Sequence, residues 1–394
     1  MGFVRVALIS HEGGGISSVC RGLANSLVKK GVDVTIFTDL QGITKPKIEE
    51  LNDLLRIVYL PSFYVPPRST WFQFRNLSFI MKFLKEQNII HGVSPDASFL
   101  FSFLKRKLDK PFIVTIHGCP RAIQRVFLQA PISCWTLGDF SNHMLKFPLD
   151  DFITKRCLFN ANHTVVCSFS ALNDLKKFYK NLDANKISVI YNGIDFDEIK
   201  DFQYSKKNTN EDFTIIYAGR LFWTKGVMWL LEAFKILSKN FRNVKLKIFG
   251  AGPLEKEIRK FICYAGLKDR VNICYRIPHN ELIMELMKAD IAVLPSLYEA
   301  QSMFVLEAMA CKKPVILFDV PFAQELVSHM DSAILAKACD VKDLYKKIEM
   351  FLLDRKLRVK YGNSAYRYVR RYHNWDTLVD KYIQVYKSVL KIDH

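Results

Sequence analysis

Phe3-Val-Arg-Val-Ala-Leu-Ile9 opens the chain as a largely apolar run, and His11-Glu-Gly-Gly-Gly15 follows it after one residue. Residues 16–30 then repeat apolar side chains at helical spacing, and Gly31 stands where a glycine often ends a helix. Val32-Asp-Val-Thr-Ile-Phe37 is a second apolar run. A strand, a glycine loop, a helix and a strand in this order predict a parallel βαβ unit.

The same alternation continues through the first half of the chain. Apolar runs of strand length recur at residues 56–60, 89–93, 111–116, 164–167 and 187–191. Helical stretches separate several of these runs, whereas residues 121–160 are rich in aromatic side chains and show no clear period. The first half therefore predicts an α/β domain, which we place at residues 1–196.

A polar stretch at residues 201–212 has the composition of a linker, and after it the pattern restarts. Strands are predicted at residues 213–218, 244–249, 271–274, 291–294 and 314–318, with helices between them. Helical pattern fills residues 341–353 and 355–390, with a break near His373. We expect a second Rossmann-like α/β domain over 197–374 and a final helix over 375–394. Two such halves imply a cleft lined by the carboxyl ends of their strands.

The composition of the 394 residues narrows the function. Hydrophobic residues make up 49%, too many for a disordered chain, and the 17 Gly and 14 Pro are too few for a fibrous one. The net charge of +18 suits nucleic acid, an anionic membrane or a phosphorylated substrate. The excess is spread along the chain. A short basic cluster lies at residues 105–125, and the largest excess per residue, at 351–394, is expected to be a solvated helical face.

Targeting signals and metal motifs are not apparent in the sequence. The sequence contains no run of about 18 apolar residues, so no transmembrane helix is predicted. The opening residues lack the cleavage site of a signal peptide. The nine cysteines form no Cys-x-x-Cys pair, which argues against a zinc site or a disulfide framework. We therefore expect a cytoplasmic protein with buried thiols.

Several motifs lie just after predicted strands, where ligands bind in such folds. The loop containing Gly14 and Gly15 could approach an anion, and His117 follows the run 111–116. Arg220 and Lys225 bracket one loop after the run 213–218 and would suit a diphosphate. Each of these residues also has an equally simple structural explanation. The glycines could form a common turn, His117 could be a structural histidine, and Arg220 and Lys225 could be surface cations.

The segment from Leu294 to Glu307 is the sharpest feature of the second half. Glu299 lies in a loop, Ser302 is placed to cap the next helix, and Glu307 falls inside that helix. Two carboxylates near one helix N-terminus could accept hydrogen bonds from sugar or ribose hydroxyls. A solvent-exposed glutamate and an ordinary helix glutamate would give the same spacing.

Together these segments resemble the glycosyltransferases of family 4, which have the GT-B fold. Tyr217-Ala-Gly-Arg-Leu-Phe-Trp-Thr-Lys-Gly226 looks like the donor-diphosphate loop of that family, and Phe249-Gly-Ala-Gly-Pro-Leu254 looks like its next glycine turn. Glu299 to Glu307 matches the Glu-x7-Glu motif, and Tyr191-Asn-Gly-Ile-Asp195 also fits. The resemblance spans nearly the whole chain, including a final helix that would return to the first domain.

The resemblance implies transfer of a hexose-type sugar from a nucleoside-diphosphate sugar to a hydroxyl of a glycan or lipid-linked acceptor, with retention of configuration. It assigns catalytic roles to Glu299, Arg220, Lys225 and His117. Gly14 and Gly15 would touch a phosphate or the acceptor. It implies no metal and no cofactor apart from the nucleotide sugar. The donor would be bound by Glu307, Gly219, Gly250, Gly252, Arg276, Ser302, Met303 and Phe304.

Three positions depart from the family pattern. Ala300-Gln-Ser302 stands where the family often has Gly-Phe-Gly, which puts in doubt which donor sugar fits. Tyr275 replaces a usual glycine and puts in doubt how the base is held. Lys312-Lys313 replaces a frequent glycine, where a turn is more affected than the chemistry.

Two other functions remain open at this point. An epimerase-like enzyme with two domains would also bind a nucleotide sugar. A basic protein that binds nucleic acid or an anionic surface would explain the charge, but it predicts clustered cations interleaved with exposed aromatics. We expect no nucleic-acid partner, and we expect peripheral membrane contact through segments such as Phe99–Lys110, where Leu and Phe neighbour basic residues.

Overall fold

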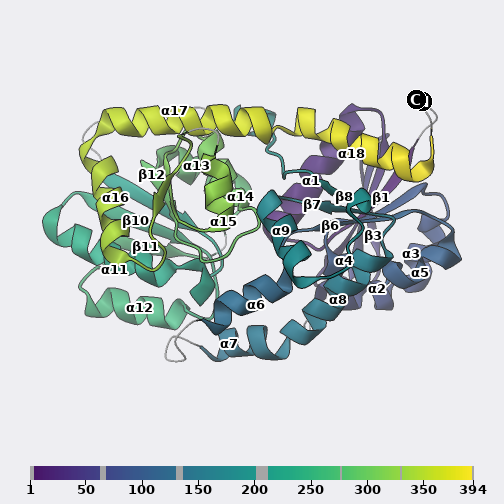
Figure 1. Ribbon diagram of the computed structural model, residues 1–394, viewed down its shortest axis with the longest axis horizontal. Coiled ribbons are helices and arrows are strands. Elements are labelled where there is room, and N and C mark those ends of the chain that lie inside the picture. Colours follow the sequence, from purple (N-terminus) through teal and green to yellow (C-terminus); the bar gives the residue numbers. More distant parts are fainter. Residues whose placement is uncertain are drawn as a thin grey trace. The chain divides into compact units, whose positions relative to one another are not determined.

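The protein is described from a computed structural model, and the description is limited to residues 4–62, 68–129, 136–200, 212–275, 277–328 and 331–392. The chain forms two compact α/β units, whose helices and strands are labelled in Figure 1. Unit 1 comprises Met1–Ala122, Phe147–Gly193 and Trp375–His394, and unit 2 comprises Ile123–Lys146 and Ile194–Asn374. The stretch 123–146, expected in the first domain, thus groups with unit 2.

Unit 1 contains an eight-stranded sheet in the order β3-β4-β2-β1-β5-β6-β7-β8. All neighbours pair in parallel except β3, which runs antiparallel to β4. The strands β1, β5 and β6 are buried along nearly their whole length. The strand bounds are β1 Arg5–Ile9, β2 Asp33–Leu40, β3 Lys47–Asn52, β4 Leu55–Pro61, β5 Ile89–Gly92, β6 Phe112–Ile116, β7 His163–Val166 and β8 Ile187–Val189.

The helices of unit 1 connect and cover this sheet. Those described are α1 Gly14–Lys29, α2 Arg68–Arg75, α3 Leu77–Leu84, α4 Pro95–Ser98, α5 Phe101–Leu108, α8 Phe147–Asn160, α9 Phe169–Phe178, the 3₁₀ turn Ala184–Lys186 and α18 Trp375–Leu390. Helix α6, Pro120–Leu128, begins in unit 1 and ends in unit 2.

Unit 2 contains a six-stranded, all-parallel sheet in the order β11-β10-β9-β12-β13-β14. The strand bounds are β9 Phe213–Ala218, β10 Val244–Phe249, β11 Val271–Cys274, β12 Ile291–Leu294, β13 Val315–Phe318 and β14 Ile334–Ala336. Its helices are α7 Leu137–Phe140, the π-helix Ser141–Leu145, α10 Phe196–Lys200, the 3₁₀ turn Trp223–Lys225, α11 Val227–Asn240, α12 Glu255–Tyr264, α13 His279–Lys288, α14 Met303–Ala310, α15 Pro321–Val327, α16 Val341–Leu353 and α17 Arg355–Tyr372.

The expected elements appear where the apolar patterns placed them, so the prediction of two Rossmann-like α/β domains is confirmed. The patterns missed α8, whose region of the sequence shows no clear period, and several elements that are short or exposed. β3, for example, has the sequence Lys-Ile-Glu-Glu-Leu-Asn and is exposed on both faces, so it carries no buried apolar run. Of the expected linker at 201–212, residues 201–211 lie outside the described part of the chain.

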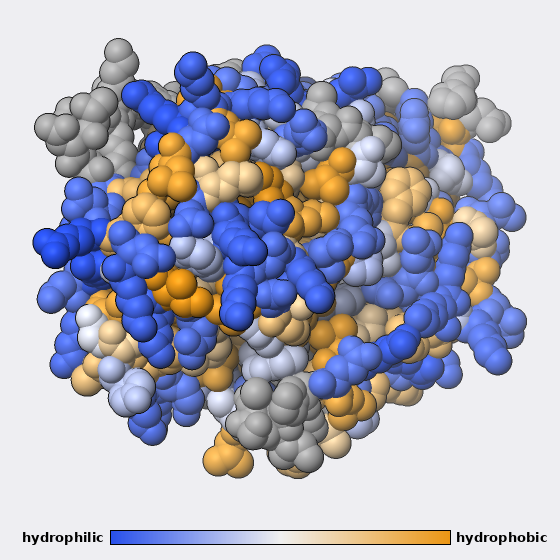
Figure 2. Space-filling view, turned by 60° about the vertical axis from the view of Figure 1, so that its left-hand side comes forward, coloured by the Kyte–Doolittle hydropathy of each residue, from blue (hydrophilic) through white to orange (hydrophobic). Residues whose placement is uncertain are grey.

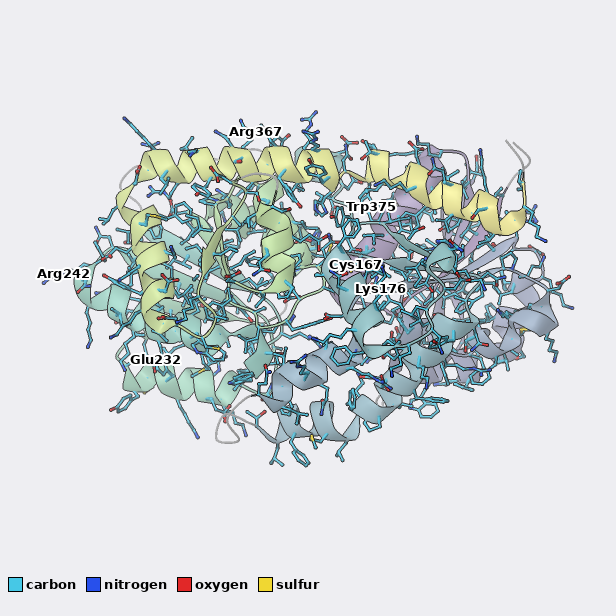
Figure 3. The ribbon with its side chains drawn as sticks, in the orientation of Figure 1. Cys167, Lys176, Glu232, Arg242, Arg367 and Trp375 are labelled. Atoms are coloured by element: carbon cyan, nitrogen blue, oxygen red, sulfur yellow. The ribbon has the colours of Figure 1, made fainter. Side chains whose placement is uncertain are left out.

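The last helix belongs to unit 1, as the resemblance implied. The indole of Trp375, which projects from the first turn of α18 in Figure 3, packs so closely on Gly22 and Gly193 that a Cβ at Gly22 would lie 2.1 Å from the indole nitrogen. Further along α18, the hydroxyl of Tyr386 hydrogen-bonds Nδ1 of the buried His91 at 2.8 Å. These contacts fix α18 against α1 and β5.

The surface carries its charge in a dispersed way. Figure 2 shows hydrophilic and hydrophobic side chains interspersed over the face that it presents. On α17, Arg367, Arg370 and Arg371 are exposed while Ala365 and Val369 are buried, so the basic C-terminal region includes a solvated helical face. Among the described helices, none combines the length and the apolar character needed to cross a membrane. The cysteines in the described ranges are free thiols.

Candidate functional site

The sheet of unit 2 has a point where its strand order reverses. β9 lies in the middle, and the chain adds β10 and β11 on one side of it and β12, β13 and β14 on the other. The loops that leave β9 and β12 therefore diverge at their carboxyl ends, which is where open α/β sheets bind ligands. The predicted residues of the second half cluster around these loops.

Glycines allow the loops at this edge to touch. A Cβ on Gly226 would lie 1.8 Å from the carbonyl oxygen of Pro295, and Gly226 has a φ of 74° that disfavours other residues. A Cβ on Gly250 would lie 1.9 Å from the carbonyl oxygen of Gly219. Gly252 similarly adjoins the backbone of Leu221. The loops after β9, β10 and β12 therefore form one continuous backbone surface.

Lys225 and Glu299 form an ion pair across this point. Lys225 Nζ donates to Glu299 Oε1 at 2.5 Å, and the Ser296 hydroxyl donates to the same oxygen at 3.0 Å. The two side chains are only 15% and 13% exposed. Burial lowers the pKa of Lys225, and the carboxylate of Glu299 opposes that shift. The pair thus places a nearly buried cation and anion side by side at the carboxyl ends of β9 and β12.

Arg220 lies at the start of the same loop, and its residue is exposed. Its carbonyl oxygen accepts a hydrogen bond from the buried Tyr217 hydroxyl at 3.2 Å, which fixes the backbone. Its guanidinium stands 5.3 Å from the centre of the Phe222 ring. A fixed backbone with an exposed guanidinium suits an arginine that meets a phosphate.

The helix α14 begins beside Glu299. The Ser302 hydroxyl accepts a hydrogen bond from the Val305 amide at 3.4 Å, so Ser302 caps the helix as the sequence predicts. The first amides of a helix, here those of Met303 and Phe304, have no partner within the helix and carry the positive end of its dipole. They therefore add donors for an anion or a hydroxyl at this edge.

Glu307 is buried in α14, with 5% of its surface exposed, and it is held by His279. His279 Nε2 hydrogen-bonds Glu307 Oε1 at 2.9 Å, and its Nδ1 hydrogen-bonds Glu198 Oε1 at 3.2 Å. These two bonds, to Glu198 and Glu307, raise the pKa of His279 to about 10. A protonated His279 therefore donates from both ring nitrogens and bridges the two carboxylates.

Sequence reasoning missed this bridge. His279 is the first residue of α13, which follows β11, and that position after a strand was the available signal. Its partner Glu198 gave no signal, because it comes from α10, 81 positions earlier in the chain. Arg276, predicted to bind the donor, lies outside the described residues.

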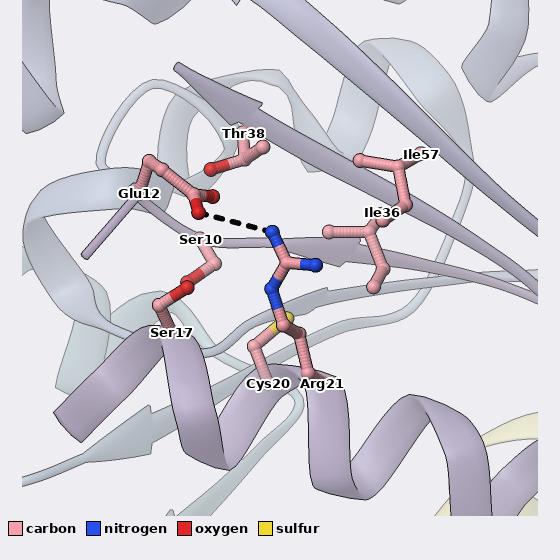
Figure 4. A pocket seen from close by; sticks show the side chains of 8 residues that line it. All are labelled: Ser10, Glu12, Ser17, Cys20, Arg21, Ile36, Thr38 and Ile57. Carbon is pink, nitrogen blue, oxygen red and sulfur yellow. Dashed lines mark hydrogen bonds and ion pairs between the residues drawn. The ribbon is translucent and has the colours of Figure 1, made fainter. Parts of the chain in front are cut away.

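In unit 1 the strand order reverses between β1 and β5, and the glycine loop leaves β1 there. Gly13 and Gly14 have φ values of 86° and 75°, and α1 begins at Gly14 with Gly15 next to it, both exposed. Beside this turn, Arg21 donates to Glu12 at 3.0 Å across a small pocket lined by Ser17 and Thr38 among others (Figure 4).

His117 follows β6 at the same edge of unit 1. Its Nε2 is 2.9 Å from the carbonyl oxygen of Val93, so Nε2 carries a proton and donates. Burial lowers the pKa of His117 to about 4, and the neutral ring leaves Nδ1 as an acceptor. His117 can thus accept a hydrogen bond from a hydroxyl but carries no charge near neutral pH.

The structure therefore gathers the predicted residues of unit 2, other than Arg276, at one sheet edge, and gathers Gly14, Gly15 and His117 at an edge of unit 1. Within the ranges that the structure describes, no group of His, Cys, Asp and Glu side chains is arranged to hold a metal ion. The donors and acceptors at these edges are those that phosphates and sugar hydroxyls need.

Comparison with known protein families gives two adjoining matches. The family model described as Glycosyltransferase Family 4 matches residues 13–198, and the model described as Glycosyl transferases group 1 matches residues 198–368. The second match contains the whole of the unit 2 cluster, and the first contains the glycine loop and His117.

Individual relatives agree with these matches. An uncharacterised glycosyltransferase from Methanocaldococcus jannaschii is 25% identical over 413 residues, covering 99% of both chains. Among solved structures, sucrose-phosphate synthase from Thermosynechococcus elongatus has a TM-score of 0.80 at 21% identity, covering 99% of this chain and 100% of that one. HepE from Anabaena, solved with UDP and glucose, has a TM-score of 0.71 at 15% identity, with 98% and 100% coverage. These structures share the fold.

Proposed function

Because the chain belongs to family 4 of the glycosyltransferases, with the GT-B fold and a nucleotide-sugar donor, we propose that it transfers a hexose-type sugar with retention of configuration. The proposed acceptor is a hydroxyl of a glycan or of a lipid-linked glycan, and the proposed location is the cytoplasm. The observation that supports this reaction most is the Lys225–Glu299 pair beside the exposed Arg220 at the strand reversal of unit 2.

Arg220 and Lys225 are proposed to stabilise the leaving group. The bond between the anomeric carbon and the β-phosphate oxygen breaks, and the electron pair leaves with the nucleoside diphosphate. Negative charge grows on that oxygen, and preorganised cations stabilise it more in the transition state than in the bound donor. The amides at the start of α14 are proposed to add hydrogen bonds to the same phosphates or to the sugar.

The two carboxylates are proposed to hold the two ends of the donor. Glu307 accepts hydrogen bonds from the ribose hydroxyls, and His279 positions that carboxylate because it fixes one of its oxygens at 2.9 Å. Glu299 grips hydroxyls of the donor sugar and stabilises the positive charge that develops at the anomeric carbon. Glu299 keeps one oxygen on Lys225 and Ser296, which leaves the other for the sugar.

Retention is proposed to follow from attack on the face that the diphosphate leaves. The acceptor oxygen forms the new bond to the anomeric carbon, and its proton passes to the departing phosphate, so atoms and charge balance without a covalent enzyme intermediate. Unit 1 is proposed to bind the acceptor, with Gly14 and Gly15 near a phosphate or the acceptor and with Nδ1 of His117 accepting a hydrogen bond from a sugar hydroxyl.

A product assay tests the reaction. The enzyme is incubated with a panel of labelled nucleoside-diphosphate hexoses, with and without glycan and lipid-linked acceptors, and the products are separated and examined by NMR. We expect nucleoside diphosphate to appear with the acceptor present and the product to keep the anomeric configuration of the donor. Nucleoside diphosphate released independently of acceptor, or a new sugar still joined to the nucleotide as an epimerase would give, contradicts the proposal.

A further inference from the structure

Helix α8 of unit 1 has apolar side chains on two opposite faces. Ile153 and Cys157 are buried on the inner face, where α8 contacts β6 and α4. Phe152 and Phe159 point away from that face and are 53% and 45% exposed. A helix that covers a sheet on one side normally turns polar residues to water. The outer face of α8 therefore lacks the composition of a purely solvated surface.

The neighbouring helix α5 extends this apolar face. Phe103 on α5 is 46% exposed, and its ring lies 5.2 Å from that of Phe99. Phe99 in turn lies 5.9 Å from the ring of Phe152 on α8. The three rings form one cluster that joins the two helices. We call this cluster, together with Phe159, the α5–α8 face.

Cations are interleaved with these rings. The guanidinium of Arg156 stands 4.0 Å from the centre of the Phe103 ring, and Lys107 and Lys155 are exposed on the same two helices. Residues 99–110 and 147–160 together carry six basic and three acidic side chains. Aromatic and basic side chains mixed on one helical surface are typical of helices that lie in a membrane interface.

One of the three acidic side chains is already neutralised. Both carboxylate oxygens of Asp151 accept hydrogen bonds from Arg121, at 2.8 and 2.9 Å, and Tyr179 donates to the first of them at 2.6 Å. The guanidinium beside it lowers the pKa of Asp151, although burial opposes this. Asp150 is half-buried, and Asp109, at the end of α5, is exposed. The charge beside the rings is therefore positive.

We propose that the α5–α8 face docks on an anionic lipid bilayer. The exposed Phe side chains enter the boundary between headgroups and acyl chains, and the lysines and Arg156 meet lipid phosphates. A second copy of the chain is a poorer occupant, because two surfaces of a protein with a net charge of +18 repel each other. Docking would bring unit 1 to lipid-linked acceptors, a consequence that rests on the proposed function.

The structure also revises which residues of the segment Phe99–Lys110 face outward. Phe101 is buried in the core of unit 1, so it cannot reach a membrane, whereas Phe103 and Lys107 are exposed. The larger part of the surface comes from α8, in the region whose sequence shows no clear period. Apolar residues on both sides of α8 hide the helical period that a one-sided helix displays.

Co-sedimentation with vesicles tests the proposal on the full chain. The vesicles contain phosphatidylcholine alone or an equimolar mixture of phosphatidylcholine and phosphatidylglycerol. One variant combines Phe103→Ser with Phe152→Ser, and another combines Lys107→Glu with Lys155→Glu. The matched controls are Tyr264→Ser, on an exposed side chain of α12, and Lys256→Glu combined with Lys260→Glu on the same helix.

We expect the wild type to bind the anionic vesicles at low salt, both test variants to bind about tenfold more weakly, and both controls to bind as the wild type does. Absence of wild-type binding, or an equal loss in the controls, overturns the proposal. A dimer in solution that Phe103→Ser with Phe152→Ser disperses, without lipid binding, also overturns it. Nucleoside-diphosphate binding, measured on the same samples by calorimetry, reports separately on the proposed function.

Discussion

At the scale of single residues, the proposed donor site depends on Lys225 and Glu299. Each is nearly buried, and a buried charge is stable only when a partner and hydrogen bonds replace the lost water. The Glu299 carboxylate is the partner of the Lys225 ammonium, and the carboxylate in turn accepts from that ammonium and from the Ser296 hydroxyl. Such a pair adds little to stability, which is consistent with a role in binding a charged ligand.

Replacing Lys225 with Met tests that role. The change removes one cation from the proposed diphosphate site and leaves Glu299 without its ion pair. We expect kcat/KM to fall by about 10²–10³-fold, the usual effect of losing one group that stabilises a developing charge. Steady-state kinetics measures it, with Lys260→Met, an exposed lysine of α12, as the control. Equal losses in both variants, or wild-type kinetics in Lys225→Met, would remove Lys225 from the site.

His279→Gln tests the bridge to Glu307. The introduced amide would keep at most part of the hydrogen bonding to Glu198 and Glu307, and it carries no charge. Glu307 would then be held less firmly, so we expect KM for the donor to rise by about tenfold while kcat changes less. A variant with only a structural defect would lower kcat and the unfolding midpoint without this separation of KM from kcat. His279→Lys, which keeps one charged donor, is expected to restore part of the affinity.

The raised pKa of His279 also predicts a pH effect on stability. Its pKa is about 10 in the folded protein and about 6.5 in the unfolded chain, so the folded state holds more protons between these values. The stability that His279 contributes is complete below about pH 6.5 and is lost as the pH rises toward about 10. Urea unfolding across this range should therefore show a smaller decline in His279→Gln than in the wild type, and equal declines would contradict the assignment.

At the scale of elements, the sequence predicts buried strands well and contacts between distant loops poorly. β9, β10 and β12 are continuous apolar runs because both faces of a parallel sheet are covered, and their bounds match the prediction. The Lys225–Glu299 pair joins residues 74 positions apart, and it exists because β12 lies beside β9. That neighbour relation depends on the order of the strands, which a local pattern does not contain.

The attachment of α18 to unit 1 gives a prediction at this scale. Tyr386→Phe removes the hydroxyl that bonds Nδ1 of His91, a side chain with no exposed surface. A buried polar atom left without its partner costs about 1–3 kcal/mol, so the free energy of unfolding should fall by that amount. Denaturant unfolding measures it, with Tyr264→Phe on the exposed Tyr264 as control. A loss no larger than that of the control would show that the bond does not anchor the helix.

At the scale of the whole molecule, the fully buried His91 and the half-buried His117, both neutral, should make unit 1 sensitive to acid. Burial lowers the pKa of His91 to about 3 and that of His117 to about 4. The unfolded chain binds these protons from about pH 6.5 downward, so the stability they contribute is complete above that pH and is lost as the pH falls toward their folded values. Thermal unfolding from about pH 7 to about pH 4 should show a falling midpoint, and a constant midpoint would contradict this reading.

The net charge of +18 has several sources at this scale. Arg220 and Lys225 belong to the proposed donor site, the lysines of α5 and α8 belong to the proposed membrane face, and the arginines of α17 form a solvated surface. The basic residues therefore do not form one binding surface, and the net charge alone does not indicate the function. The motifs at the sheet edges indicate the family instead. The departures Ala300-Gln-Ser302 and Tyr275 leave the donor sugar and base for experiment.

Calorimetric titration with a panel of nucleoside diphosphates tests whether unit 2 binds the donor through its diphosphate, and it requires no knowledge of the sugar or the acceptor. The panel holds the uridine, guanosine, adenosine, cytidine and thymidine forms, and the proteins are the wild type, Arg220→Ala and the control Lys260→Ala. We expect at least one diphosphate to bind the wild type and the control with equal affinity, and to bind Arg220→Ala at least about tenfold more weakly. No binding by the wild type, or equal binding by Arg220→Ala, would contradict the proposed donor site.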